Sequence, residues 1–203
     1  MFHFSKPTTA EIEDAIGSAS KVAPLKAEFI ALRDGSKVEV PPGFAHDRLR
    51  VQLGAGRQAF ESAVRGFEQW KQFDLGWTRV ANPAAEIEVG NIIAVEVYSL
   101  GLWSLNLSQI VEVLEETFSF GFTYKTTRQH VEEGEERFLL NLDPFSGAVW
   151  YDLEAVSRPH HSLARLAFPV ARFLQHRFAR NSARTMREIA AGTKQELRPG
   201  QRS

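Results

Sequence analysis

The feature that most constrains this sequence is the alternation of apolar and polar residues between positions 93 and 155. Successive side chains of a β-strand point to opposite faces, so a period of two predicts strands with one apolar face. The apolar sets are Ile93, Val95 and Val97; Trp103, Leu105, Leu107, Val111 and Val113; Phe118, Phe120, Phe122 and Tyr124; Phe138, Leu140 and Leu142; Val149, Tyr151, Leu153 and Ala155. The residues assigned to the opposite face of the second set are Ser104, Asn106, Ser108 and Glu112.

Two further strands are predicted before this region, at Ala45–Leu53 and Gly76–Val80. Turn residues such as Gly90-Asn91, Gly101 and the segment 143–147 separate the strands by short connections. Short connections and one apolar face per strand predict an antiparallel meander with one face buried.

Three helices are predicted around the strands. Thr8 and Glu11 have the spacing of a capping box, which predicts a helix from Thr9 to Ala19. An apolar stripe from Phe60 to Trp70 predicts a helix over 57–73. The Gly54-x-Gly56 that precedes it lacks the context of a phosphate loop, and we interpret it as a tight turn.

The last predicted helix runs over 161–190 and combines an apolar stripe with a basic one. Pro169 is predicted to kink this helix or to mark the start of its main segment. The basic stripe contains Arg165, Arg172, Arg180, Arg184 and Arg187. Because a sheet with one apolar face needs a cover, this helix is the expected partner of the sheet.

Together the elements predict an α+β fold in which a curved antiparallel sheet of about seven strands wraps a long C-terminal helix, the helix-grip arrangement. Residues 1–192 are predicted to form a single domain, made of an N-terminal extension over 1–44 and a helix-grip body over 45–192. The polar tail 193–203 is predicted to be disordered.

Composition excludes several classes of protein. The chain has no cysteine, which excludes disulfides, thiolate metal sites and a cysteine nucleophile and favours the cytoplasm. No segment approaches the roughly 20 apolar residues of a membrane span. From Arg158 onward nine Arg and one Lys face two Glu, a net of +8, which leaves −9 for the rest of a chain with net charge −1. The basic part is therefore expected to dock on the acidic body or to bind a partner.

Short stretches spread over most of the chain carry a more specific resemblance. They are Lys6-Pro7, Leu53-Gly54-Ala55-Gly56 with Phe60, Trp70 to Trp77, Gly121-Phe122-Thr123-Tyr124, Thr126, His130, Gly134-Glu135-Glu136-Arg137-Phe138, Ser157-Arg158-Pro159, Pro169 and Gln175. On these residues the chain resembles a bacterial and plant family called domain of unknown function 1990. Its element order resembles the helix-grip fold of the START and Bet v 1 superfamily, which implies a cavity between sheet and helix.

The sequence departs from the pattern of that family at three places. Lys125 and Val131 stand where glycine and proline are expected, and the segment 108–113 lacks an expected Cys-Arg pair. A function that depends on that cysteine is therefore absent here. The resemblance implies no established activity, and it supports ligand binding only by extension.

The bulky residues predicted to face the helix are the candidate contacts of a small apolar or lipid-like ligand. They are Trp77, Trp103, Phe120, Phe122, Tyr124, Phe138 and Tyr151, with Arg158 as a partner for an anionic head group. Tyr124, His130 and Glu135 are the candidate catalytic residues, because a phenol and an imidazole beside carboxylates can act as acid and base. Tyr124, His130 and Arg158 also have structural interpretations, as a core tyrosine, a turn histidine and a structural ion pair with an acidic residue of the body.

No metal or cofactor site is predicted. His130 is the single imidazole of its acidic cluster, and His160, His161 and His176 are too far apart or point in different directions. The arginine stripe lacks interleaved aromatic residues, so nucleic acid is not the expected partner. Three hypotheses stay open: a ligand-binding protein, an enzyme that uses Tyr124 and His130, and an interaction module that uses the basic helix. The ligand and the oligomeric state are not predicted.

Overall fold

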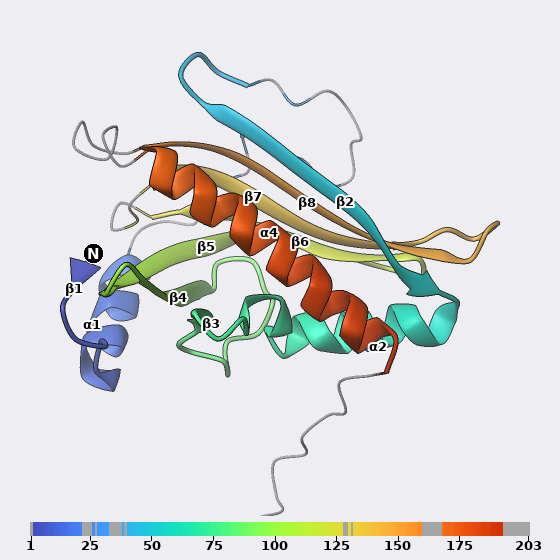
Figure 1. Ribbon diagram of the computed structural model, residues 1–203, viewed down its shortest axis with the longest axis horizontal. Helices are drawn as coiled ribbons and strands as arrows, with labels where there is room; N and C mark the ends of the chain where they lie inside the picture. The colour runs from blue at the N-terminus through green and yellow to red at the C-terminus, as the bar shows by residue number, and fades with distance from the viewer. Residues whose placement is uncertain are drawn as a thin grey trace, which may run out of the picture.

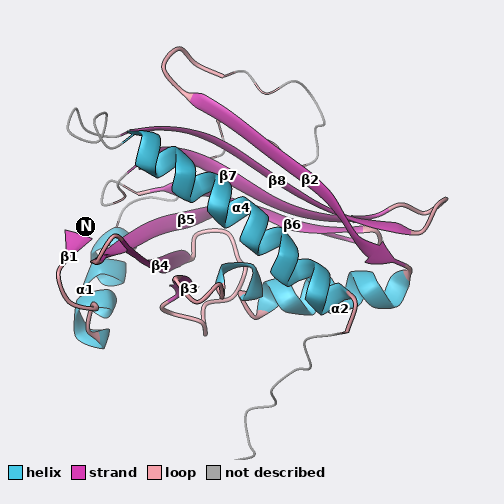
Figure 2. Ribbon diagram, viewed as in Figure 1, coloured by secondary structure: helices cyan, strands magenta, loops and turns pink. Residues whose placement is uncertain are grey.

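The computed structural model describes residues 2–21, 26, 28–32, 38, 40–127, 130, 132–159 and 168–192. Figure 1 shows a curved sheet with one long helix, α4 (Phe168–Ala190), running diagonally across it. Figure 2 distinguishes the strands of this sheet from the helices that pack around it. The predicted histidine pair at 160–161, the start of the predicted C-terminal helix and the tail 193–203 lie outside the described residues.

The sheet is antiparallel throughout and has the predicted number of strands in its body. These strands are β2 (Ala45–Ala55), β3 (Thr78–Val80), β4 (Ile92–Ser99), β5 (Leu102–Glu116), β6 (Ser119–Thr126), β7 (Glu132–Leu142) and β8 (Ala148–Pro159). Their order is β2-β8-β7-β6-β5-β4-β3, and a short β1 (Phe2–His3) pairs with β5. The α+β fold with a seven-stranded curved sheet and a C-terminal helix is confirmed.

A β-bulge in β5 changes which residues of this strand face the helix. The pairing of β5 with β6 shifts between Ile110 and Glu112, so that Val111 is the extra residue. A bulge adds one residue to one strand and exchanges the faces on its two sides. Trp103, Leu105 and Leu107 therefore point to the convex face, although the period of two assigned them to one face with Val113. That assignment was wrong for the first half of β5.

The N-terminal helix α1 (Thr9–Ala19) covers part of the convex face. The predicted capping box is confirmed: the hydroxyl of Thr8 accepts from the backbone N–H of Glu11, and the Glu11 carboxylate accepts from the backbone N–H of Thr8 at 2.7 Å. Ile12 packs with Leu105 and Leu107 in a small apolar cluster. The apolar residues of β5 that turn away from α4 are thus buried under α1.

Helix α2 (Arg57–Glu68) is shorter than predicted. It begins after Gly56, whose φ of 87° is in the region that favours glycine and whose N–H donates to the carbonyl of Gly147 at 2.8 Å. The predicted continuation to residue 73 is interrupted at Trp70, which has a left-handed backbone with a φ of 56°, and a 3₁₀ turn η1 (Lys71–Phe73) follows. The Trp70 indole N–H donates to the carbonyl of Ala85, which anchors this break in the core.

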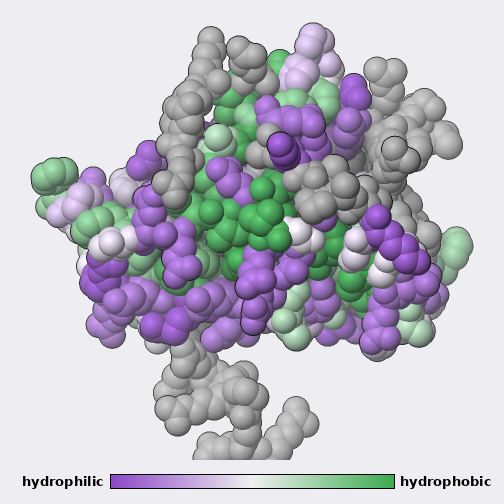
Figure 3. All heavy atoms as spheres, turned by 180° about the vertical axis from the view of Figure 1, so that it is seen from behind, coloured by the Kyte–Doolittle hydropathy of each residue, from purple (hydrophilic) through white to green (hydrophobic). Residues whose placement is uncertain are grey.

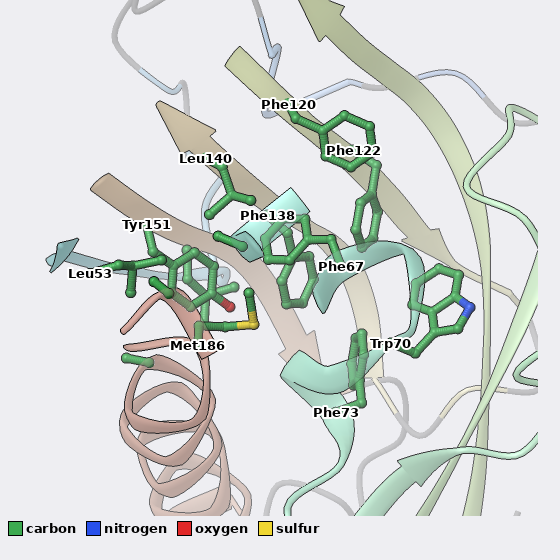
Figure 4. Close-up of a cluster of buried hydrophobic side chains, with 14 of the residues drawn as sticks. Leu53, Phe67, Trp70, Phe73, Phe120, Phe122, Phe138, Leu140, Tyr151 and Met186 are labelled. Atoms are coloured by element: carbon green, nitrogen blue, oxygen red, sulfur yellow. The ribbon is translucent and has the colours of Figure 1, made fainter. Parts of the chain in front are cut away.

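The main core lies between α2, the sheet and the C-terminal half of α4. Figure 4 shows Phe67 of α2 among aromatic side chains from β6, β7 and β8. Its ring centroid lies 6.0 Å from that of Phe122 and 5.7 Å from that of Tyr151. Met186 of α4 closes the cluster and approaches Gly66, where an added Cβ would lie 3.1 Å from the Met186 methyl group. Gly66 thus lets α2 and α4 pack closely.

Residues 28–32, here called the strap, cross the convex face. The Glu135 carboxylate accepts from the backbone N–H groups of Glu28, Phe29 and Ile30 at 2.7, 2.9 and 3.1 Å. The N–H of Leu32 donates to the carboxylate of Glu112 at 2.9 Å. Side chains, rather than a strand ladder, therefore form the hydrogen bonds of these backbone N–H groups.

Figure 3, seen from behind, shows apolar side chains in the middle of the molecule with hydrophilic ones around them.

A buried network of charges lies on the convex face. Arg137 lies 3.2 Å from a carboxylate oxygen of Asp152 and 2.5 Å from one of Glu154. Arg48 also binds Asp152, at 2.6 Å, and His46 binds Glu154 at 2.7 Å. Arg137 donates a further hydrogen bond to the carbonyl of Ala31 in the strap. Opposite charges and hydrogen bonds thus offset the cost of burying these groups.

Candidate functional site

The concave face is filled at one end and hollow at the other. Aromatic side chains fill the end that α2 covers. Under the N-terminal half of α4 the sheet and the helix enclose a pocket of about 610 Å³. On β5 and β8 small side chains, Ser104, Ser108 and Ala155, line this pocket, whereas Phe120, Phe122 and Phe138 of β6 and β7 occupy the filled end. The difference in side-chain volume explains why the space stays open.

The pocket combines apolar and polar walls. Its apolar lining includes Leu49, Val95, Val97, Leu153, Leu174 and Phe178. Its polar lining includes Ser104, Asn106, Ser108, Tyr124, Thr126 and Glu136. Directly paired residues of antiparallel strands share a face, and Ser104 and Asn106 pair with Val97 and Val95. The first half of β5 thus places a polar row beside the apolar side chains of β4.

An acid and a phenol meet inside the pocket. Tyr124 of β6 pairs with Glu136 of β7, and the Tyr124 hydroxyl donates a hydrogen bond to the Glu136 carboxylate. His130, between the two strands, lines the same pocket. The structure thus brings two of the predicted catalytic residues, Tyr124 and His130, to one cavity with a carboxylate that the sequence analysis did not select.

A polar clasp closes α4 over the pocket. Arg172 of α4 binds the carboxylate of Asp47 on β2 through both terminal nitrogens, and His176 lies 3.2 Å from the same carboxylate. Gln175 donates to the hydroxyl of Ser157 at 3.1 Å. Partial burial raises the pKa of Asp47, but the hydrogen bonds and charges of Arg172 and His176 outweigh it and hold that pKa below its usual value. The clasp therefore persists into mildly acidic solution.

Few of the predicted ligand contacts line the pocket. Trp77 and Tyr124 do. Phe120, Phe122, Phe138 and Tyr151 face the helix as predicted, but they are buried in the core. The position of α2 over this part of the concave face was not predicted from the sequence. The signal was available, because the apolar stripe of α2, with Phe60 and Phe67, also needs a surface to cover.

Two other predicted contacts lie away from the pocket. Trp103 is on the convex side, where its ring centroid lies 5.0 Å from that of Tyr98 and the Lys6 ammonium lies 5.7 Å from its ring. Its predicted inward position was wrong, because the bulge in β5 exchanges the faces. Arg158 is exposed, and its guanidinium binds the Glu133 carboxylate at 2.8 Å. The structural interpretation of Arg158, an ion pair with an acidic residue of the body, describes this contact, which lies at the surface.

Alternation along β7 turns the Glu135 carboxylate away from the pocket. Gly134, Glu135 and Glu136 all line the pocket, but the Glu135 carboxylate is on the convex face and holds the strap. Arg137 returns to the convex network and Phe138 to the core. The acidic side chain that β7 contributes to the pocket is thus Glu136, one residue from the predicted candidate.

The described ranges hold neither a cluster of metal ligands nor a helix that could span a membrane. These ranges contain no group of three or more histidine or acidic side chains that could hold a metal ion. Among the helices they contain, none has the length and apolar character to cross a bilayer.

Comparison with known proteins places the chain in a family. The profile of a domain of unknown function, DUF1990, matches residues 28–185. The chain belongs to the DUF1990 family. A UPF0548 protein of Dictyostelium discoideum is 30% identical over 215 residues, which cover 98% of this chain and 99% of that protein. UPF0548 proteins of Arabidopsis thaliana and Deinococcus radiodurans are 32% and 31% identical, covering 75% and 92% of this chain and 76% and 97% of their own length.

Solved structures show more distant likenesses. The crystal structure of Ara h 8.0201 has 11% sequence identity and a TM-score of 0.48, covering 74% of this chain and 99% of that one. A hypothetical protein of Helicobacter pylori has 11% identity and a TM-score of 0.49, covering 75% and 97%. Neither likeness assigns an activity to the DUF1990 chain.

Proposed function

We propose that this protein binds a small, largely apolar molecule in the pocket between the concave face and the N-terminal half of α4. The observation that carries the proposal is the volume of the pocket, about 610 Å³. Ligand sites commonly have volumes of roughly 300–1,000 Å³, with mostly apolar walls and a few polar groups that fix orientation. The lining by Val95, Val97, Leu153 and Phe178 beside a few polar groups fits this description.

The packing of the neighbouring core supports the same proposal. Protein interiors are close-packed, and an empty apolar space forfeits contact energy. The end of the concave face under α2 is densely filled, with Phe122 and Phe138 stacked at a centroid distance of 5.0 Å. The hollow beside it therefore does not reflect a loosely packed fold. A ligand that occupies it would regain the missing contacts.

The test is native mass spectrometry of the protein purified from its own host, followed by extraction and identification of the bound molecule. Ala155 lies on the pocket wall, so Ala155→Phe is expected to fill the space and to reduce occupancy at least tenfold. Ala84→Phe, at an exposed loop position, is the matched control and should keep its ligand. An Ala155→Phe protein that folds normally and retains full occupancy would contradict the proposal.

A second candidate function is enzymatic, and the hydrogen bond between Tyr124 and Glu136 inside the pocket favours it. A carboxylate can accept a proton from a bound substrate while the phenol orients it or donates in return. The expected result is that Tyr124→Phe and Glu136→Gln keep ligand binding but lose turnover of the extracted molecule, followed by mass spectrometry. Equal turnover in the variants and the natural protein would remove this candidate.

The interaction module through the basic helix receives less support. Arg172 is held by Asp47, and Arg187 donates to the carbonyl of Gln52. Arg165 lies outside the described residues, and the concave face is not filled under this part of α4. Co-purification of a macromolecule that is lost with Arg180→Glu would instead favour this module, since Arg180 is exposed.

A further inference from the structure

We infer that the ligand is electrically neutral and carries a hydroxyl or amide group that faces β5. This inference rests on the proposed binding function and names the chemical class of the bound molecule. It follows from the polar row of β5, from two buried polar atoms that lack a hydrogen-bond partner among the described residues, and from the charges around the pocket.

The polar row consists of Ser104, Asn106 and Ser108. All three are buried, with exposed fractions of 8%, 8% and 2%. A strand wall that contacts only apolar atoms gains nothing from hydroxyl and amide groups, because burying them costs free energy unless they are hydrogen-bonded. Three such residues at alternate positions of one strand are therefore suited to a polar edge of a bound molecule.

Two polar atoms of lining residues have no hydrogen-bond partner in the described part of the chain. They are the amide oxygen Oδ1 of Asn106 and the hydroxyl Oγ1 of Thr78. The Asn106 amide nitrogen Nδ2 donates to the hydroxyl of Ser104 at 3.0 Å, so the amide oxygen is the side that still needs a donor. A ligand hydroxyl or N–H, with a small rotation of the Asn106 side chain, supplies that donor. A ligand carbonyl can accept from the Thr78 hydroxyl.

The charges around the pocket disfavour an anionic head group. Of the described lining residues, only Arg48 and Arg180 are Lys or Arg. The guanidinium of Arg48 binds Asp152 on the convex face, and Arg180 is exposed on α4. Glu136 adds a carboxylate to the buried wall. A ligand carboxylate beside β5 would be buried without a Lys or Arg partner from the described residues, which is costly.

The test uses three probes with the same apolar body: hydroxypyrene, methylpyrene and pyrenecarboxylate. Binding is titrated by pyrene fluorescence at pH 7. Hydroxypyrene is expected to bind about tenfold more tightly than methylpyrene, the effect of one net hydrogen bond, and pyrenecarboxylate to bind weakest. In Asn106→Leu/Ser108→Ala the ratio of the hydroxypyrene affinity to the methylpyrene affinity should fall from about ten to about one. Ser119→Ala, whose hydroxyl bonds Asn141 outside the pocket, is the control and should keep the preference.

The outcomes separate this inference from the proposed function. If methylpyrene binds and Ala155→Phe abolishes its binding, the pocket is a binding site, regardless of the affinity for hydroxypyrene. Equal affinities for hydroxypyrene and methylpyrene, or a preference that survives in the double variant, would then overturn only the inferred ligand class. Tightest binding of pyrenecarboxylate would overturn its neutrality. Failure of all three probes, with the fold confirmed by thermal denaturation, would overturn both statements.

Discussion

Glu135 is expected to stabilise the fold rather than to take part in chemistry, and Glu135→Ala tests this directly. Its carboxylate is almost fully buried, at 1% exposure, and accepts three backbone hydrogen bonds from the strap. Alanine removes the acceptor but leaves the three N–H groups in place. The strap must then keep unsatisfied donors or leave the convex face.

The loss of stability can be estimated for both outcomes, a strap that stays in place and a strap that leaves the convex face. Each hydrogen bond to a charged group contributes about 1.5–3 kcal/mol, so three unsatisfied donors would cost up to about 9 kcal/mol. If the strap lifts off, its N–H groups bind water and the main loss is that of apolar burial. The two buried strap residues, Ile30 and Leu32, contribute about 1.5–3 kcal/mol each. The outcome with the smaller loss sets the expected decrease in unfolding free energy at about 3–6 kcal/mol.

Urea denaturation measures the unfolding free energy, and hydrogen exchange of the amides at 28–30 reports on the strap. Glu133→Ala is the matched control, because Glu133 lies two residues earlier on the same face of β7 and forms an exposed ion pair with Arg158. This control should lose less than about 1 kcal/mol. An unfolding free energy of Glu135→Ala within about 0.5 kcal/mol of the natural protein, with unchanged amide protection, would refute the reasoning.

Three other substitutions test separate features. Gly134→Ala is expected to lower the unfolding free energy, measured by urea denaturation, by about 2–4 kcal/mol, because the new Cβ would overlap the carbonyl oxygen of Val156. Gly17→Ala is the control and should not lower it, because the space around Gly17 is open. Leu100→Gly should stabilise by about 1 kcal/mol, because Leu100 is exposed with a φ of 53°; an unchanged or lower melting temperature would contradict this. Asp47→Asn should cost about 1–2 kcal/mol at pH 7. The pKa of Asp47 is lowered in the folded protein, so its contribution to stability is lost as pH falls below about 4 through that pKa. The difference in unfolding free energy between the natural protein and Asp47→Asn should shrink over that pH range, and a difference that stays constant would disprove the clasp.

The sequence predicted best what short-range patterns determine. Thr8 and Glu11 form their capping box within one turn, and the alternation around Phe122 and Phe138 reports directly which side of a strand is apolar. These features depend on neighbours in the chain. They could therefore be predicted without knowledge of the tertiary structure.

The features that were not predicted from the sequence depend on contacts between residues that are far apart in the chain. A bulge at Val111 leaves no mark in composition, yet it moves Trp103 to the convex face and the polar row of β5 into the pocket. The roles of the two neighbouring glutamates also depend on distant segments. Glu135 faces the strap, about a hundred positions earlier in the chain, whereas Glu136 faces Tyr124. Alternation places them on opposite sides but does not tell which side is hollow.

The alternation along β7 also bears on how the chain avoids misfolding. In the segment 135–138, the side chains go in turn to the convex face, the pocket, the convex face and the core, and each destination accepts a different chemistry. A shift of β7 by one residue against its neighbours would drive the Arg137 guanidinium into the aromatic core and expose Phe138. Misaligned pairings are thus penalised at several consecutive positions at once. Insertions and deletions should be excluded from this strand even where single substitutions are tolerated.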